Sequence, residues 1–248
     1  MKLLNGDCME LLPDIPEHSV DLILCDLPYG TTDCKWDHVL PMDRLWTEYD
    51  RILKSNGVAA LFAAQPFTTA LINSNAPNFR YCWYWKKNNK TGALLAKVQP
   101  MRCMEDICIF YRKKPTYNPQ GLIRLERPKY NAPKPGNVYG KKANGSVQEY
   151  TNYHIHLLEF NGVQAGSKER KHPTQKPVPL LEYMVRTYTN EGETVLDNCM
   201  GSGSTGVVCL RSGRHFIGIE KDPHYFQVAQ ERLEQVATDM AILVAGQQ

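Results

Sequence analysis

The sequence predicts an α/β fold in which helices cover both faces of a sheet. An apolar run at 20–25 is stopped by Asp26 and Pro28, as is typical of a buried strand that ends in a loop. Near the other end of the chain, a strand expected at 194–197 leads into a glycine-rich turn and a helix, and a strand expected at 215–220 leads into another helix. Strands that alternate with helices in this way build a sheet of this class.

The elements of the first half follow from hydrophobic spacing. Between Pro41 and Lys54 apolar residues recur at helical spacing, which predicts a helix, and a strand is expected at 58–63. Residues 81–86 and 107–111 are rich in aromatic and β-branched types, which predicts two further strands with an antiparallel pairing as one option.

The second half begins with a segment of irregular composition. Between Lys113 and Lys171, proline, glycine, asparagine and basic residues show little periodicity, which predicts an insertion. Regular structure resumes with a helix expected at about 178–189, and the last helix is expected from Pro223 to about Val236. A chain of 248 residues is long enough to bury one sizeable core with such an insertion.

Composition excludes several classes of protein. A hydrophobic content of 42% with 22% charged residues is far from that of disordered chains, and no apolar run reaches the length that a bilayer requires. The first seven residues turn polar too soon for a signal peptide, so we expect a cytoplasmic protein. Eight cysteines occur without a C-x-x-C pair, which argues against a metal site and against a secreted disulfide framework and favours reduced packing residues.

The net charge of +3 conceals a strongly basic block. From Arg80 to Lys142 there are 15 Lys and Arg residues against three acidic ones, a net charge of +12, and the rest of the chain carries −9. Tryptophan and tyrosine residues are interleaved with these cations. Because cations neutralise phosphates and rings stack on bases, the block has the composition of a nucleic-acid surface, with a solvated basic face as the alternative.

A glycine-rich turn, Gly-Ser-Gly-Ser-Thr-Gly at 201–206, follows the strand that ends at Asp197. Glycines let the backbone approach a ligand closely, and Glu220 at the end of the next strand can accept hydrogen bonds from two ribose hydroxyls. This context favours a nucleotide moiety over a merely structural turn. A nicotinamide dinucleotide would use the same turn, but its motif usually opens a domain. Here the rest of the sheet must precede the motif, and such a circular permutation brings Asp26 beside the turn.

Asp26-Leu27-Pro28-Tyr29-Gly30 stands at the expected carboxyl end of a strand. Pro28 restricts Leu27 to an extended conformation, so that backbone carbonyls and the Asp26 carboxylate can point outward together. Acceptors of this kind can hold both hydrogens of an amino group, which turns the nitrogen lone pair towards an electrophile. Extruding a base costs a few kcal/mol, and one stack on Tyr29 returns about 1–3 kcal/mol. An ordinary strand-ending turn is the alternative for this motif taken alone.

The motif at Asp26 resembles the catalytic Asp-Pro-Pro-Tyr motif of the amino-methyltransferases that act on DNA. His-Pro-Thr-Gln-Lys-Pro at 172–177, Val-Leu-Asp at 195–197 with the glycine turn, and Phe-Ile-Gly-Ile-Glu at 216–220 resemble the cofactor half of that family. Gly6-Asp7 is similar to its opening motif. The order, with the catalytic motif first, is that of the beta group of the family.

The resemblance implies a Rossmann-like, S-adenosylmethionine-dependent methyltransferase sheet that is circularly permuted and carries an inserted target-recognition region. By this analogy, residues 1–111 form the catalytic half, 112–171 the target-recognition insertion and 172–248 the cofactor-binding half. It also implies methyl transfer from S-adenosylmethionine to an exocyclic amino group in DNA, by direct attack and without a covalent enzyme intermediate.

The resemblance also implies residue roles. Asp26 and Tyr29 would handle the flipped base, with the backbone of Leu27 and Pro28 assisting. Asp7 would contact the adenine of the cofactor, Glu220 its ribose, and Lys176 with the glycine turn its methionine end. The implied cofactor set is Asp7, Asp26, Lys176, Asp197, Gly201, Ser202, Gly203, Ser204, Thr205 and Glu220.

Two positions depart from the family pattern. Leu27 replaces the first proline of the catalytic motif, and Asn198-Cys199 replace the usual Pro-Phe after Asp197. Neither change removes a side-chain donor or acceptor, so we expect altered geometry or reduced activity rather than an inactive enzyme.

Aspartate at the head of the motif favours N6 of adenine over N4 of cytosine, by resemblance. Methylation at carbon five of cytosine would need a cysteine nucleophile, and the Pro-Cys dipeptide usual for it does not occur. A nicotinamide oxidoreductase, a nonenzymatic DNA-binding protein with a relict cofactor fold, and an RNA or protein substrate stay open as alternatives.

We expect double-stranded DNA as the partner, and we expect no association with a membrane. A homodimer and a companion restriction endonuclease are compatible with the resemblance. We expect 86–90 to be a phosphate-contacting loop, with a solvated surface loop as the alternative. His172 is interpreted as structural, and Thr31–Asp37 with Trp36 either close over the target base or are simply packed. The predicted DNA-contacting residues are Lys86, Lys87, Lys90, Arg112, Lys113 and Lys114.

Overall fold

The computed structural model describes residues 1–30, 38–132, 145–164, 166–167 and 170–245. These residues form two compact units. Met1–Asn118 and His156–Gln248 make up the first unit, and Pro119–Ile155 make up the second. Among the described residues, no helix has the length and apolar character needed to cross a membrane.

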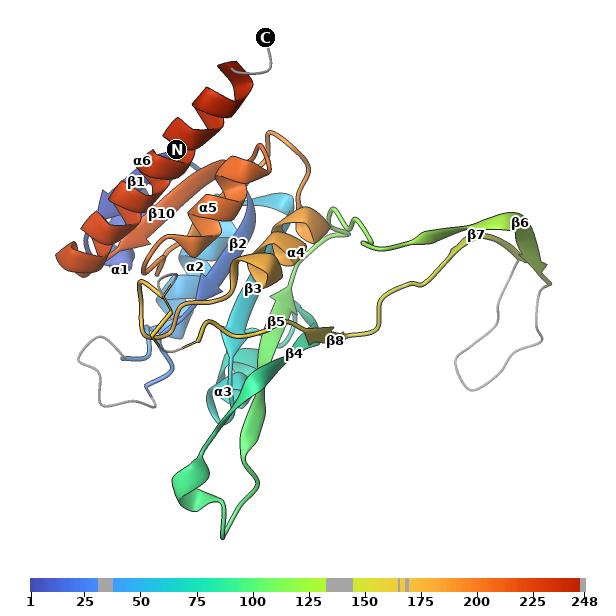
Figure 1. Ribbon diagram of the computed structural model, residues 1–248, viewed down its shortest axis with the longest axis horizontal. Helices are drawn as coiled ribbons and strands as arrows, with labels where there is room; N and C mark the ends of the chain where they lie inside the picture. The colour runs from blue at the N-terminus through green and yellow to red at the C-terminus, as the bar shows by residue number, and fades with distance from the viewer. Residues whose placement is uncertain (31–37, 133–144, 165, 168–169, 246–248) are drawn as a thin grey trace. The chain divides into compact units, whose positions relative to one another are not determined.

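The first unit is built on an eight-stranded sheet with the strand order β1-β10-β9-β2-β3-β5-β4-β8 (Figure 1). Neighbouring strands are parallel, except that β5 runs antiparallel to both β3 and β4. The strands are β1 (Lys2–Asn5), β2 (Val20–Asp26), β3 (Leu53–Ala63), β4 (Phe79–Thr91), β5 (Arg102–Phe110), β8 (Leu157–Glu159), β9 (Thr194–Asp197) and β10 (His215–Glu220).

Helices cover both faces of this sheet (Figure 1). Side chains alternate between the faces of a strand. In β2, Leu22 and Leu24 therefore join one core, while Ile23 and Cys25 join the other. The first core is covered by α4 (Val178–Tyr188), α5 (Ser204–Arg211) and α6 (Pro223–Ala245), and the second by α1 (Cys8–Leu11), η1 (Leu12–Asp14), α2 (Met42–Ile52) and α3 (Phe67–Ser74).

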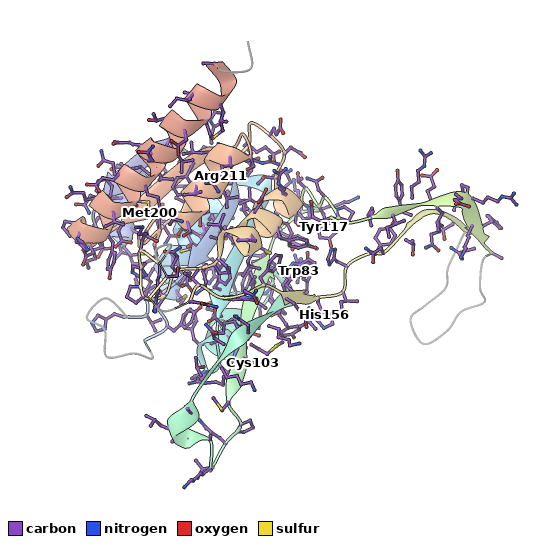
Figure 2. The ribbon with its side chains drawn as sticks, in the orientation of Figure 1. Trp83, Cys103, Tyr117, His156, Met200 and Arg211 are labelled. Atoms are coloured by element: carbon purple, nitrogen blue, oxygen red, sulfur yellow. The ribbon has the colours of Figure 1, made fainter. Side chains whose placement is uncertain are left out.

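The first core extends to the edge of the sheet through aromatic side chains. Trp83 of β4 lies between the sheet and α4 (Figure 2), where its indole N–H donates to the Tyr188 hydroxyl at 2.7 Å. The Tyr81 hydroxyl forms a second hydrogen bond with that of Tyr188 at 2.8 Å. In the aromatic run at 81–86, Trp83 and Trp85 are therefore the buried side chains, while Tyr84 and Lys86 are exposed.

The predicted α/β sheet and its permuted order are confirmed. β9, which leads into the glycine turn, pairs in parallel with β2, with Val195 opposite Leu22 and Leu196 opposite Ile23. Because both strands run the same way, their carboxyl ends lie side by side, although about two thirds of the chain separates Asp26 from Asp197. The predicted strands at 194–197 and 215–220 coincide with β9 and β10.

Several predicted boundaries are wrong. β3 begins at Leu53 instead of 58, α6 continues beyond Val236 to Ala245, and 86–90 belong to strand β4 instead of a loop. This last segment is mostly exposed, so its sequence has no buried periodicity, and its strand conformation comes from pairing with β5. The short elements β1, α1 and α3 were not predicted, because a few residues carry too little pattern.

The second unit contains a two-stranded sheet, although its sequence shows little periodicity. β6 (Ile123–Asn131) pairs in antiparallel fashion with β7 (Ser146–Thr151). Most side chains of β6 are exposed, so no buried face imprints an alternating pattern on the sequence. A further strand, β8, lies in the first unit, within the segment 112–171 that was expected to be irregular.

Candidate active site at the carboxyl edge of the sheet

The predicted site residues gather at one edge of the sheet because parallel strands end there together. β2 ends at Asp26, β9 at Asp197 and β10 at Glu220. β5 runs the opposite way and pairs Asp106 with Ala63, the last residue of β3. Its first residues, including Glu105, therefore lie at the same edge as the ends of the parallel strands.

The Asp26 carboxylate is held from two sides. The Tyr29 hydroxyl donates to Oδ1 at 2.7 Å, and the Lys176 ammonium donates to Oδ2 at 2.5 Å. The Tyr29 ring stacks on Phe67 with centroids 5.1 Å apart and an interplanar angle of 22°. The motif predicted to be catalytic thus presents an ordered acceptor with an aromatic ring beside it.

Lys176 links Asp26 to a second carboxylate. Its Nζ lies 3.4 Å from Oε2 of Glu105 and 5.1 Å from the centroid of the Phe62 ring. Glu105 also pairs with Lys87, whose Nζ lies 2.7 Å from Oε1. The side chains of Lys87, Glu105 and Lys176 are at most 16% exposed, so they form a partly buried network in which cation and carboxylate alternate.

Electrostatics hold this network in its charged form. Burial opposes the charge of Lys176, but Asp26 and Glu105 outweigh it and raise the pKa of Lys176. Burial likewise opposes the charge of Glu105, and Lys176 and Lys87 outweigh it and lower the pKa of that carboxyl. For Asp26, burial dominates and raises the pKa despite Lys176, which favours a role as proton acceptor. Burial also raises the pKa of Tyr29 well above its usual value, so the phenol stays a donor.

The glycine turn after β9 adopts a conformation that favours glycine. Gly201 and Gly203 have φ angles of 51° and 73°, in the left-handed region. A Cβ at Gly203 would lie 3.1 Å from the Cβ of Ala229 in α6, so the turn packs closely on that helix. Arg232 of α6 donates to the Ser202 carbonyl at 3.0 Å and fixes the loop from behind.

Glu220 ties this turn to the end of β10. Its Oε2 accepts from the Gly201 amide and its Oε1 from the Asp222 amide, both at 2.8 Å. A carboxylate has about four acceptor positions, so both oxygens keep capacity for ribose hydroxyls. An acidic acceptor beside a glycine turn at a helix start fits the nucleoside and methionine parts of S-adenosylmethionine.

Other members of the predicted cofactor set have structural contacts. The buried Asp197 accepts from the Thr205 hydroxyl at 2.7 Å and from the Cys199 amide at 3.2 Å, and burial raises its pKa to about 7. The Ser204 hydroxyl accepts from Arg232 at 3.0 Å, and the Ser202 hydroxyl donates to Gln175 at 3.2 Å. These side chains shape the turn, and their direct contact with a cofactor stays a prediction.

Asp7 and Lys176 also have protein partners. Asp7 caps α1 by accepting from the Met9 amide at 2.9 Å, and it pairs with Lys221 at 2.9 Å. It follows β1, whose Asn5 lies opposite Glu220, so it stands at the edge where the adenine contact was predicted. Lys176 pairs with the two carboxylates Asp26 and Glu105, and its predicted contact with the methionine end of the cofactor stays a prediction.

The two departures from the family pattern are accommodated by packing. Leu27 is 2% exposed and lies in the core on the α2 side, so its side chain replaces a proline without opening a gap. Asn198 is buried and accepts a hydrogen bond from the Tyr49 hydroxyl at 2.6 Å. The polar group at this position is therefore satisfied within the core.

Histidine and cysteine have the structural environments that were predicted. His172 packs against Tyr225 with centroids 4.2 Å apart, and its Nδ1 accepts from the Thr174 amide at 3.3 Å at the start of the loop before α4. Burial, with Lys176 nearby, lowers the pKa of His172 to about 4, which keeps the ring neutral.

Cys8, Cys25 and Cys209 are buried free thiols, and burial raises the pKa of Cys25 to about 12.

The predicted DNA-contacting lysines differ in how accessible they are. Lys86 pairs with Glu159 at 2.6 Å on the surface, whereas Lys87 lies in the buried network and is already paired with Glu105. Arg112 lies 3.7 Å from Asp50 and donates to the Leu53 carbonyl. Lys90, Lys113 and Lys114 are exposed, and their contact with DNA stays a prediction. The predicted cover over the target base, Thr31–Asp37, lies outside the described residues.

Glu105 and Phe67 belong to this site and were not predicted. Glu105 is one of only three acids within the basic block from Arg80 to Lys142, and this isolation is the one signal in the sequence that points to it. Phe67 opens α3 with no distinguishing pattern. Both reach the site only through the tertiary arrangement of the sheet.

The site and fold define a class of protein, and comparison with known families identifies it. The sequence matches the DNA methylase family over residues 20–231. The chain therefore belongs to the DNA methyltransferases that modify N6 of adenine or N4 of cytosine and depend on S-adenosylmethionine. The predicted family, activity class and cofactor are confirmed.

Known relatives extend over most of the chain. The Type II methyltransferase M.HpaI of Haemophilus parainfluenzae is 29% identical over 249 aligned residues, which cover 94% of this chain and 74% of that protein. The crystal structure of M1.HpyAVI with S-adenosylmethionine has a TM-score of 0.63 at 25% identity and covers 94% of this chain and 98% of its own. The PvuII DNA methyltransferase, described as cytosine-N4-specific, has a TM-score of 0.66 at 16% identity, with 95% and 90% covered, and shares the fold.

Proposed function

We propose that this methyltransferase modifies the N6 amino group of adenine within a specific sequence of double-stranded DNA. The observation that carries the proposal is the Asp26 carboxylate, held by Tyr29 and Lys176 beside the turn that follows β9. An exocyclic amino group is a donor and needs such an acceptor. Aspartate instead of serine at the head of the motif supports adenine over cytosine through the resemblance to the family.

In the proposed reaction, Asp26 acts on the amino group of the target base, and the cofactor supplies the methyl group. S-adenosylmethionine supplies an electrophilic methyl group when it is bound. Asp26 accepts a hydrogen bond from the amino group, because its oxygens keep acceptor capacity beyond Tyr29 and Lys176. This contact directs the nitrogen lone pair away from the base ring, and Asp26 Oδ1 or Oδ2 takes up the proton that the nitrogen releases. Holding the reacting atoms in line contributes up to roughly 7–11 kcal/mol to lowering the barrier.

The cofactor would be held beside Asp26, at the carboxyl ends of β9 and β10. We assign its ribose to Glu220, its adenine to the neighbourhood of Asp7 and its methionine end to the backbone of 201–205. Asp197 and Thr205 support this turn through their mutual hydrogen bond. Lys176 acts by keeping Asp26 in place.

Expression in a bacterial host that lacks DNA methylation, followed by single-molecule sequencing, tests the proposal. The wild-type chain is expected to place N6-methyladenine in one sequence context. Asp26→Ala is expected to place none while retaining duplex binding, and Asp239→Ala on the exposed face of α6 serves as the matched control.

The other outcomes separate the alternatives. Modified cytosine at N4 would overturn the assignment of adenine. A wild-type chain that binds duplex but leaves it unmodified would favour a nonenzymatic DNA-binding protein. Full activity of Asp26→Ala would remove Asp26 from the mechanism.

A further inference from the structure

The β4–β5 hairpin continues beyond the site as a projecting finger, which we define as residues 86–104 (Figure 1). Lys86 pairs with Met104 and Thr91 with Arg102, and the turn between them contains η2 (Ala93–Leu95). Figure 2 marks Cys103 on this projecting part of β5. Glu105 adjoins the finger, so the finger begins at the network that holds Asp26.

The finger carries several large apolar side chains that are exposed to solvent. Leu94 is 100% exposed and Val98 is 80% exposed, and Leu95, Met101 and Met104 are exposed as well. Strands rise about 3.3 Å per residue, so Arg102 lies roughly 10 Å along β5 from Glu105 and the turn lies beyond it. A group of apolar side chains so placed has no contact with the core and suggests a partner.

The positive charge of the finger indicates the chemical class of the partner. It contains five cations and no acidic residue between Lys86 and Met104. Two of these cations are paired at its base, while Lys90, Lys97 and Arg102 form no ion pair with any described residue. Exposed cations around an apolar tip match a duplex, in which phosphates surround the apolar faces of stacked bases.

We propose that the finger enters the DNA duplex next to the target base, with Leu94 and Val98 as a wedge between bases and Lys90, Lys97 and Arg102 on the flanking phosphates. This inference rests on the proposed function, because a base must leave the stack before it reaches Asp26. Apolar wedges of this kind replace stacking contacts that an extruded base gives up. The finger thereby lowers the cost of extrusion.

The test compares two substrates that carry the recognition sequence found by sequencing. In one duplex the target base is paired, and in the other it faces an abasic site and needs no unpairing. Leu94→Ser with Val98→Ser is expected to lower kcat/KM on the paired duplex by roughly 10-fold to 100-fold, the loss expected for one stacking contact. On the unpaired substrate the same variant is expected to match the wild type within about two-fold.

The matched control is Ile242→Ser with Leu243→Ser, which removes exposed apolar groups on α6 outside the finger. Equal loss on both substrates, or no loss on either, would overturn the proposal. So would sedimentation showing that the finger variant turns a wild-type dimer into monomers, because the finger would then bind a second copy of the chain. A wild-type protein that methylates neither duplex would instead overturn the proposed function.

A second measurement addresses the phosphates. Lys97→Ala is expected to reduce the slope of log affinity against log salt for duplex binding by about 0.9, the value for one phosphate contact. An unchanged slope would remove Lys97 from the contact.

Discussion

At the scale of single residues, the site depends on cations and carboxylates that alternate in one series. The members of this series are Lys87, Glu105, Lys176 and Asp26. Neighbours in this series lie 2.5 to 3.4 Å apart with little exposure to solvent. Buried charges are tolerated only when they are paired. Because Lys176 is shared between Glu105 and Asp26, a change at Glu105 is expected to affect the Asp26 carboxylate, the proposed proton acceptor, without direct contact.

Glu105→Gln is expected to lower kcat by roughly 10-fold to 100-fold, within the range for a weakened proton acceptor. The charge of Glu105 contributes to the raised pKa of Asp26, so its removal lowers that pKa. The acid limb of the kcat profile is therefore expected to shift to lower pH, while the KM for the cofactor stays unchanged. Kinetics across the pH range check this, and an unmoved acid limb would contradict a role for Glu105 through Asp26.

The same substitution is expected to lower the free energy of unfolding at neutral pH by about 3 kcal/mol, because it leaves two lysines without their shared carboxylate. The folded pKa of Glu105 is depressed, so its contribution is present above the ordinary carboxyl pKa and is lost as pH falls through the depressed value. Glu159→Gln is the control, because the Lys86–Glu159 pair is exposed to solvent and should contribute little to the free energy of unfolding. Urea unfolding measures both, and equal losses would contradict a buried network.

At the scale of elements, the turn between β9 and α5 combines a left-handed backbone with close packing. Gly203 has a positive φ, and its Cα lies against α6, so two separate costs oppose any side chain there. Gly192 shares the positive φ, at 79°, but a Cβ there would meet nothing within 4 Å. The two positions therefore separate backbone strain from packing.

Gly192→Ala is expected to lower the free energy of unfolding by about 1–2 kcal/mol, the cost of a left-handed backbone for a side chain. Gly203→Ala is expected to add about 1–3 kcal/mol for overpacking against Ala229 and to weaken cofactor binding as the turn shifts. Urea unfolding and titration with S-adenosylmethionine measure these effects. Equal destabilisation by both substitutions would show that α6 shifts to accommodate the added Cβ at position 203 without a packing cost.

At the scale of the whole molecule, the first unit contains the eight-stranded sheet, both cores and the catalytic edge. The second unit, Pro119–Ile155, contributes β6 and β7 and is narrower than the insertion predicted at 112–171. Assignment of target recognition to this insertion stays a prediction. Cofactor binding should then be independent of the second unit.

Replacement of 119–155 by a short Gly-Ser linker is expected to leave the affinity for S-adenosylmethionine within about two-fold of the full chain, as for independent sites. Methylation at the recognition sequence is expected to be lost, because base readout depends on side chains that enter a groove. Calorimetry and sequencing of modified DNA measure the two properties. Specific methylation by the shortened chain would place recognition outside the second unit.

The main elements of the fold could be read from the sequence where their side chains are buried. β9, β10, α2 and α4 were predicted almost to the residue, because buried strands of a parallel sheet read as apolar runs and a buried helix face imprints a period of 3.6. β6 and the outer part of β4 were missed, since nearly every side chain there is exposed. Backbone hydrogen bonds to the neighbouring strand stabilise those strands, and such bonds produce no alternation of apolar and polar residues in the sequence.

The sequence by itself determined the family and the cofactor class, because these depend on short runs of neighbouring residues around Asp26 and Gly203; the catalytic role of the motif at Asp26 stays a prediction. Only the tertiary structure decided that Glu105 and Lys176 surround Asp26. Their meeting requires β5 to enter the sheet antiparallel between β3 and β4, which brings its first residues to the carboxyl edge. Strand pairing over such a separation is set by the packing of the whole sheet, and no local pattern encodes it.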